Sequence, residues 1–174
     1  MNENLQRYPK MKKVDLSNIN PSLDGVDHTR IDKVANTLLG RNLTIESHRV
    51  FHHPQYGSFV SVYTAIQWYK LKEKNDKIRE MNGNELRDYL SQLAKGEEES
   101  IFNEKYVSDA IMETFLYYSI LSSPPLLELF LKNDKPFVAY YIDEKGKFKM
   151  RDKQMTRVLN KLKPKLVESS QLEK

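Results

Sequence analysis

Apolar side chains recur every three or four residues in six stretches of the chain, which is the spacing of one buried helix face. Residues typical of helix ends support this pattern. Ser61 and Asn84 stand at helix starts, Pro124 at a first helical position, and Gly40 and Gly96 at helix ends. The pattern therefore predicts helices over residues 28–40, 61–70, 84–96, 103–121, 123–134 and 155–163.

Two other stretches are rich in β-branched and aromatic residues and are bounded by turn residues, which favours strands. The first covers residues 42–53 and ends near Pro54, and the second covers residues 135–143. A turn over residues 143–146 leads from the second strand into "KFKMR". This short segment is predicted to pair with the second strand as a hairpin.

The predicted elements make an α+β fold, a mostly α-helical single domain with a small β-sheet. The chain has 174 residues, which suits one domain with a substantial core. We expect this domain to cover residues 21–163. Polar composition predicts flexible segments on either side of it, over residues 1–20 and 164–174.

Composition excludes several classes of protein. The chain contains no cysteine, so disulfides, zinc–thiolate sites, iron–sulfur clusters and cysteine nucleophiles are absent. No Gly-rich phosphate loop and no nucleophile-elbow motif occurs, and no cofactor or metal is expected. No apolar run approaches the roughly 20 residues of a membrane span, and the first residues lack the apolar core of a secretory signal. We therefore expect a cytoplasmic protein without a membrane partner.

The net charge of +4 is unevenly distributed along the chain. Residues 145–165 contain nine basic residues and a single acidic residue, Asp152, so the rest of the chain is acidic. Such a segment can attract nucleic acid or an acidic protein, and it can equally be a solvated helix face without a partner. If it binds nucleic acid, the contacting residues are predicted to be Lys147, Lys149, Arg151, Lys153, Arg157 and Lys161.

Three of the four histidines cluster within the first predicted strand. In an extended strand, Glu46, His48 and His52 would point to the same face, which is a weak metal-site hypothesis. The alternative is an exposed strand face on which His and Glu serve only solubility.

The segment "YGSFVSVYTAIQWYKLK", residues 56–72, combines core and binding chemistry. Val62, Ala65, Ile66 and Tyr69 are spaced to form the buried stripe of its helix. Gln67 and Lys70 lie beside this stripe and can line the rim of one pocket, offering an amide and a phosphate-directed charge. Two aromatic residues in the same helix can stack on a planar ligand or pack in the core, namely Tyr63 and Trp68.

The stretch "SVYTAIQWYK" resembles the helix signature of the YbiA-like, or NADAR, superfamily, which reads Ser/Thr-Val-Glu-His-x-x-Gln-x-x-Lys. Ser61, Val62, Gln67 and Lys70 match this signature. The resemblance continues over residues 56–163 through "MNGNELRDYLSQLAKGEEESIFNEKYVSDAIMETFLYYSI", "PPLLELFLKNDKPFVAYYIDEKGKF" and "QMTRVLNKLK". Members of the family are implicated in N-glycosidic bond cleavage on ribosyl compounds.

The resemblance implies a YbiA-like fold and a site for an N-ribosyl compound such as ADP-ribose or a related nucleotide. In such a site Tyr63 and Trp68 would pack near the base or ribose, Gln67 would hydrogen-bond it, and Lys70 would meet a phosphate. The acidic residue of the family signature falls on Tyr63, and the family's Trp-Gly pair after the aspartate turn is absent. Because glycosidic cleavage needs a carboxylate, Asp143 would have to supply it, with Glu113 as a second candidate. The sequence leaves open whether this N-glycosidase-type domain hydrolyses its ligand or only binds it.

Overall fold

The computed structural model describes residues 8–13 and 15–172 of the chain. Within these residues it confirms the α+β class, because six α-helices accompany three two-stranded sheets. Residues 1–7 and 14 of the predicted flexible amino-terminal segment lie outside the described part. The chain divides into two compact units, unit 1 (Met1–Thr44 with Pro124–Lys174) and unit 2 (Ile45–Ser123). The predicted single YbiA-like domain stays a prediction.

None of the helices in the described ranges combines the length and the apolar character needed to cross a membrane.

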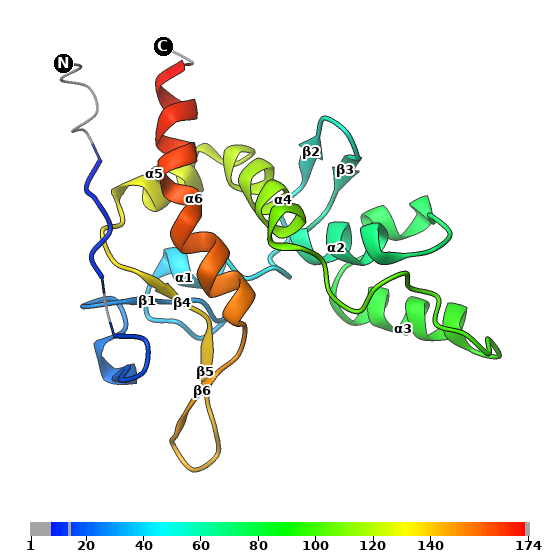
Figure 1. The fold of residues 1–174 in the computed structure, drawn as a ribbon, viewed down its shortest axis with the longest axis horizontal. Helices are drawn as coiled ribbons and strands as arrows, with labels where there is room; N and C mark the ends of the chain where they lie inside the picture. Colours follow the sequence, from blue (N-terminus) through cyan, green and yellow to red (C-terminus); the bar gives the residue numbers. More distant parts are fainter. Residues whose placement is uncertain (1–7, 14, 173–174) are drawn as a thin grey trace. The chain divides into compact units, whose positions relative to one another are not determined.

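Unit 1 holds both ends of the described chain. Its elements are the 3-10 helix η2 (Pro21–Leu23), β1 (Thr29–Arg30), α1 (Leu38–Asn42), α5 (Pro124–Lys132), β4 (Phe137–Val138), β5 (Tyr140–Ile142), β6 (Phe148–Met150) and α6 (Lys153–Leu172). β1 pairs with β4 in parallel, and β5 pairs with β6 as the predicted antiparallel hairpin. Figure 1 shows the long helix α6 beside β4 and α5, with the β5–β6 hairpin projecting beyond the amino-terminal end of α6.

Two side chains of α6 cover the edge of β4 that does not face β1. The amide of Asn160 accepts a hydrogen bond from the Phe137 N–H (2.8 Å) and donates to the Phe137 carbonyl (2.9 Å). One turn earlier, the Thr156 hydroxyl accepts from the Ala139 N–H at 2.9 Å. Helix α6 therefore supplies the hydrogen bonds that another strand would give, which allows the buried β4 to remain in a two-stranded sheet.

The helix predicted over residues 28–40 is wrong, because most of this segment is not helical. The buried Asp24 carboxylate accepts from the backbone N–H groups of Arg30 (2.9 Å) and Asn36 (2.7 Å). These bonds hold the segment in turns, and Val34, expected in the core, is 69% exposed. Only Leu38–Asn42 forms a helix.

Gly40, expected to end that helix, lies inside α1 instead. A Cβ atom at this position would come within 2.0 Å of the Arg30 carbonyl oxygen. The glycine is therefore required by the close approach of α1 to β1 and not by a helix end.

The last helix, predicted to end before Pro164, continues through it to Leu172. The predicted flexible tail is therefore helical over 164–172, and the final two residues lie outside the described part of the chain. Proline removes one helical N–H, and a helix tolerates this where packing on either side outweighs the lost bond. Here Leu162 and Leu166, on either side of Pro164, are both fully buried.

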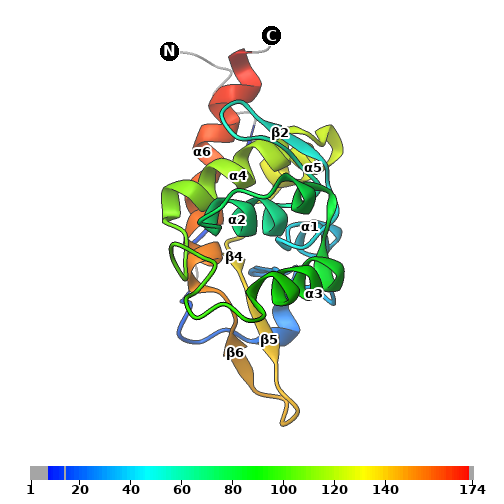
Figure 2. The same ribbon diagram turned by 90° about the vertical axis from the view of Figure 1, so that its right-hand side faces the viewer.

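Unit 2 is built around helix α4. Its elements are β2 (Phe51–His53), β3 (Gly57–Phe59), α2 (Val62–Lys70), the 3-10 helix η3 (Asp76–Glu80), α3 (Gly83–Ala94) and α4 (Asp109–Leu121). Helix α2 packs against α4 and η3, and α4 also packs against β2 (Figure 2). Phe115 of α4 forms the centre of the core, and its ring lies within 6.3 Å of the rings of Phe51, His53, Tyr56, Phe59 and Tyr69.

Several predicted boundaries in unit 2 change. The strand predicted over 42–53 is confirmed only for Phe51–His53, and it pairs with β3, which was not predicted. The helix predicted from residue 103 begins at Asp109, because the Ser108 hydroxyl accepts from the Ile111 N–H. The predicted start of α2 at Ser61 is confirmed.

Arg79 of η3 joins the β2–β3 hairpin to the core. Its guanidinium donates to the carbonyl oxygens of Tyr56 (2.7 Å) and Ser58 (3.1 Å). The same group lies 4.5 Å from the Phe59 ring centre and 4.4 Å from that of Trp68. One side chain thus binds the hairpin backbone and packs on two core aromatics.

His53 is buried at the end of β2 with both ring nitrogens engaged. Nδ1 accepts from the backbone N–H groups of Gln55 (3.1 Å) and Tyr56 (3.3 Å). The proton of the neutral ring is therefore on Nε2, which donates to the Thr114 hydroxyl at 2.8 Å. A second proton on Nδ1 would break two backbone hydrogen bonds.

We expect this histidine to make unit 2 less stable in mild acid. Burial lowers the pKa of His53 below its ordinary value of 6.5, and the neighbouring His52 lowers it further. The unfolded chain therefore binds a proton at a pH where the folded chain does not, so stability present above about pH 6.5 is lost as the pH falls. Urea unfolding of the parent and of His53→Asn, followed by fluorescence of the single tryptophan, checks this. The variant should lose less stability between about pH 7 and about pH 5, and an identical loss in both proteins would contradict the assignment.

Candidate functional site

Helix α2 is buried around most of its circumference. Its buried side chains are Val62, Thr64, Ala65, Ile66 and Trp68. Tyr69 is half-buried in the ring cluster around Phe115. The other half-buried side chains are Tyr63, Gln67 and Lys70, which lie at positions i, i+4 and i+7 and so share one face. We name this set the α2 stripe.

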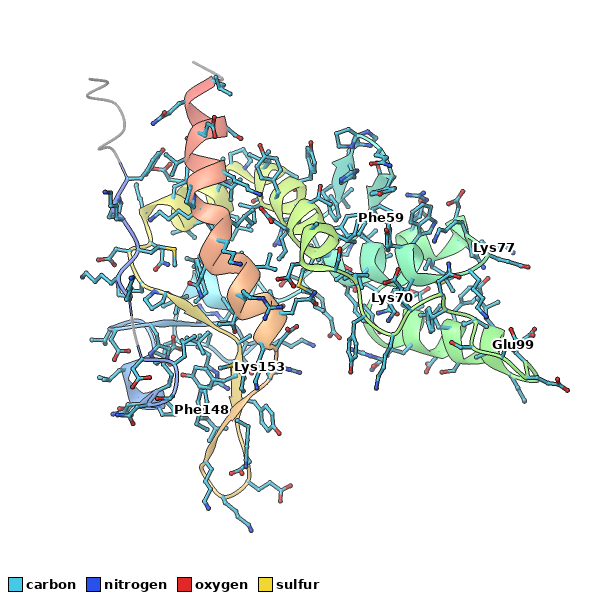
Figure 3. All side chains as sticks on the ribbon, viewed as in Figure 1. Phe59, Lys70, Lys77, Glu99, Phe148 and Lys153 are labelled. Carbon is cyan, nitrogen blue, oxygen red and sulfur yellow. The ribbon has the colours of Figure 1, made fainter. Side chains whose placement is uncertain are left out.

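At its carboxyl-terminal end the α2 stripe carries a cation and an amide in contact. The Lys70 ammonium lies 3.5 Å from the Gln67 side-chain oxygen and 4.8 Å from the centre of the Phe102 ring. Burial lowers the pKa of Lys70, while the charge of Glu104 acts in the opposite direction. Figure 3 shows Lys70 at the end of α2.

At the amino-terminal end of the α2 stripe, the Tyr63 ring lies against a second cation. The Arg87 guanidinium of α3 lies 5.3 Å from the Tyr63 ring centre and also pairs with Glu46. The Tyr63 backbone N–H donates to the Ile45 carbonyl at 2.8 Å. Burial raises the pKa of Tyr63 above its ordinary value of 10.0, so its hydroxyl keeps its proton at neutral pH and can donate to a ligand.

Trp68 lies outside the α2 stripe. Its indole N–H donates to the Asp76 carboxylate at 3.1 Å, and its ring packs against Phe59 and the Arg79 guanidinium. It is 9% exposed. Of the four predicted ligand-binding residues, the structure thus brings together Tyr63, Gln67 and Lys70 and places Trp68 in the core.

Asp143, the predicted catalytic residue, forms the turn of the β5–β6 hairpin. One of its carboxylate oxygens accepts from the backbone N–H groups of Lys145 (2.9 Å) and Lys147 (2.8 Å). Asp143 belongs to unit 1, whereas the α2 stripe belongs to unit 2. The second carboxylate candidate, Glu113, is half-buried on α4 in unit 2. A role for either residue in hydrolysis stays a prediction.

The basic residues predicted as a nucleic-acid surface all belong to unit 1 and are all exposed. They lie on β6, on its flanking residues and on α6: Lys147, Lys149, Arg151, Lys153, Arg157 and Lys161.

The weak metal hypothesis loses its geometric basis, because residues 46 and 48 precede the observed strand and do not continue it. Glu46 pairs instead with Arg87, and the His52 ring is hydrogen-bonded to Ser58. In the described ranges no group of three or more His, Asp or Glu side chains is placed to hold a metal.

Sequence reasoning missed three residues around α2. Arg87 and Phe102 lie far from the helix along the chain, and no spacing rule connects them to it. Lys74 carries a local signal, since cations just beyond a helix satisfy its last carbonyl groups. Its ammonium donates to the carbonyl oxygens of Trp68 (3.3 Å) and Leu71 (2.7 Å).

A pocket of about 610 Å³ lies next to the carboxyl-terminal end of α2 and is lined by Leu71, Lys72, Asn75, Leu93 and Ile101, among others. No residue of the α2 stripe lines it. The candidate binding surface is therefore the open face of the stripe and not this pocket.

Comparisons with protein-family models, with curated proteins and with solved structures found no match for this chain.

Proposed function

We propose that the protein binds a phosphorylated N-ribosyl compound, such as ADP-ribose or a related nucleotide, on the α2 stripe. The supporting observation is that a helix otherwise committed to the core leaves three polar side chains, Tyr63, Gln67 and Lys70, accessible on one face. The resemblance of "SVYTAIQWYK" to the YbiA-like signature points to the same residues.

Each member of the stripe suits one part of such a ligand. The Lys70 ammonium can pair with a phosphate, and its partial burial strengthens a charge-assisted hydrogen bond there. The Gln67 amide offers both donors and an acceptor to a ribose hydroxyl or a base edge. The Tyr63 hydroxyl can donate, and the Arg87 guanidinium beside it, which also pairs with Glu46, lies at the opposite end of the stripe from Lys70.

The stripe supports binding more strongly than hydrolysis. Cleavage of an N-glycosidic bond develops positive charge on the ribose, which a carboxylate must stabilise. Tyr63, Gln67 and Lys70 include no carboxylate, and the Asp143 oxygen described above is engaged in its own turn. Of the two carboxylate candidates only Glu113 shares unit 2 with the stripe, and it is not a member of the stripe, so we propose a binding domain that lacks the glycosidase reaction.

Isothermal calorimetry with ADP-ribose and with NAD tests this function. Lys70→Ala should raise Kd about tenfold, because a charge-assisted bond to phosphate is worth about 1.5 kcal/mol or more. Gln67→Ala should raise it about threefold to tenfold through loss of a neutral hydrogen bond. Lys72→Ala, a nearby exposed lysine that pairs only weakly with Glu99, is the matched control and should leave Kd unchanged.

Three results would contradict parts of the proposal. Absence of binding by the parent protein would discard the function. Binding that neither Lys70→Ala nor Gln67→Ala weakens would discard the site. Release of nicotinamide from NAD by the parent protein, followed by chromatography, would show hydrolysis and discard the binding-only interpretation.

A further inference from the structure

The β5–β6 hairpin of unit 1 has one side turned to the core and one open side. Tyr140 is fully buried, and its ring lies 4.8 Å from that of Phe148 across the hairpin. Side chains alternate along a strand, so Tyr141 and its cross-strand partner Lys149 point to the opposite side. Tyr141 is 43% exposed there, on a hairpin that projects from the rest of unit 1 (Figures 1 and 2).

Two further cations flank β6. Lys147 and Arg151 lie two residues before and two residues after Lys149, just outside β6 (Phe148–Met150). Both are exposed, and Arg151 makes one long ion pair, 3.5 Å, with Asp32. Tyr141 thus has one cation, Lys149, directly across the hairpin, and two more cations lie next to β6 in the chain.

A further row of cations lies on α6, which follows β6 in the chain. Lys153, Arg157 and Lys161 are spaced by four residues, about 6 Å along the axis, and all are exposed. They border a groove of about 510 Å³ that Leu16 and Met150 also line. Figure 3 labels Lys153, the first of them, at the start of α6, and Phe148 on β6.

The intervening acid does not interrupt this track. Asp152 is half-buried, and its carboxylate accepts from the Met155 N–H at 2.8 Å in the first turn of α6. Its charge is therefore directed at the positive end of the helix.

We propose that this track binds single-stranded nucleic acid, with phosphates along the lysines and arginines and one unpaired base stacked on Tyr141. Exposed cations alone would suit any polyanion, including an acidic protein. An exposed aromatic ring among them suits a chain in which flat bases alternate with phosphates. A base within a duplex is covered on both faces by its neighbours, so only an unpaired base can stack on Tyr141. This surface is separate from the α2 stripe and does not depend on its function.

Fluorescence anisotropy with a labelled oligothymidylate, and with a duplex of the same length, tests the proposal at low salt. We expect the single strand to bind more tightly than the duplex. Tyr141→Ala should raise Kd for the single strand about tenfold, the effect of one lost base stack, whereas Tyr141→Phe should keep the parent affinity. Lys149→Ala should reduce the slope of log K against log salt by about 0.7, the value for one phosphate of a single strand. Lys132→Ala, an exposed lysine on α5, is the control and should change neither quantity.

Several outcomes would overturn the proposal. No binding at low salt would contradict the proposal that this surface binds nucleic acid. Equal or tighter binding of the duplex, or an unchanged Kd for Tyr141→Ala, would contradict the stacking of a base on Tyr141. Equally tight binding of polyglutamate, with no effect of Tyr141→Ala, would identify an acidic protein as the partner. Circular dichroism of each variant ensures that a loss of affinity is not a loss of folding.

Discussion

Arg79→Ala is expected to lower the free energy of unfolding by about 3 kcal/mol, the combined effect of hydrogen bonds to two carbonyl oxygens, an ion pair with Asp76 (2.7 Å) and two cation–π contacts. The guanidinium donates to the carbonyl oxygens of Tyr56 and Ser58 and covers the rings of Phe59 and Trp68. Alanine leaves both carbonyl groups without this donor and opens a gap over two buried rings. Trp68 is the only tryptophan of the chain, so its fluorescence during urea unfolding reports on unit 2 directly.

Two further variants separate these contributions. Arg79→Lys keeps the charge and loses the planar fork, so its loss should fall between those of the parent and of Arg79→Ala. Lys77→Ala removes a neighbouring exposed cation from η3 and should change stability by less than about 0.5 kcal/mol. A loss for Arg79→Ala no larger than that of Lys77→Ala would show that Arg79 does not hold the hairpin.

In unit 1 we expect Asn160→Leu to cost about 3 kcal/mol, because it leaves two buried backbone groups without partners. The Asn160 amide serves both the N–H and the carbonyl of Phe137, a residue that is fully buried. Leucine branches at the same carbon but offers neither donor nor acceptor. Urea unfolding followed by far-ultraviolet circular dichroism measures the loss, and amide hydrogen exchange should accelerate at Phe137.

Asn160→Asp sharpens this experiment. A carboxylate still accepts from the Phe137 N–H but cannot donate to its carbonyl, so the exchange of that amide should stay slower than in Asn160→Leu. Lys161→Leu places the same apolar residue at the adjacent exposed position and is the control for helix propensity. If Asn160→Leu unfolds at the same urea concentration as Lys161→Leu, the amide does not act as a strand partner for β4.

The elements that could be predicted from sequence are those whose boundaries depend on neighbouring residues. The start of α2 follows from the Ser61 hydroxyl, which accepts from the Thr64 N–H three residues later. Helix α5 begins at Pro124, as predicted, because proline suits a first helical position. The β5–β6 hairpin follows from the turn between Asp143 and Gly146, which has a φ of 74°.

The errors arise where distant residues outweigh the local pattern. Residues 28–40 have helical spacing, but the Asp24 carboxylate and pairing with β4 hold this segment in other conformations. Pro164 is a local signal for a helix end, which burial of Leu162 and Leu166 overrides. Neither outcome can be derived from a window of ten or fifteen residues.

The same distinction applies to the candidate site. The α2 stripe could be predicted because Gln67 and Lys70 lie one turn apart beside the apolar positions of the same helix. Trp68 could not be assigned to the core with certainty, because its partners, Arg79 and Asp76, lie on another element. Arg87, which places a second cation beside the stripe, lies on α3. No spacing of residues within α2 indicates its contact with Tyr63.

The connectivity of the two units has a consequence for the order in which the chain can fold as it is synthesised. All contacts within unit 2 join residues of one continuous segment, Ile45–Ser123. Unit 1 is discontinuous, and Thr29 of β1 must wait for Phe137 of β4 before its sheet can form. During synthesis, all residues of unit 2 are therefore present before β4, the partner strand of β1, has been made. Until then, the amino-terminal segment can form only local contacts, such as the hydrogen bonds of the Asp24 carboxylate to the N–H groups of Arg30 and Asn36.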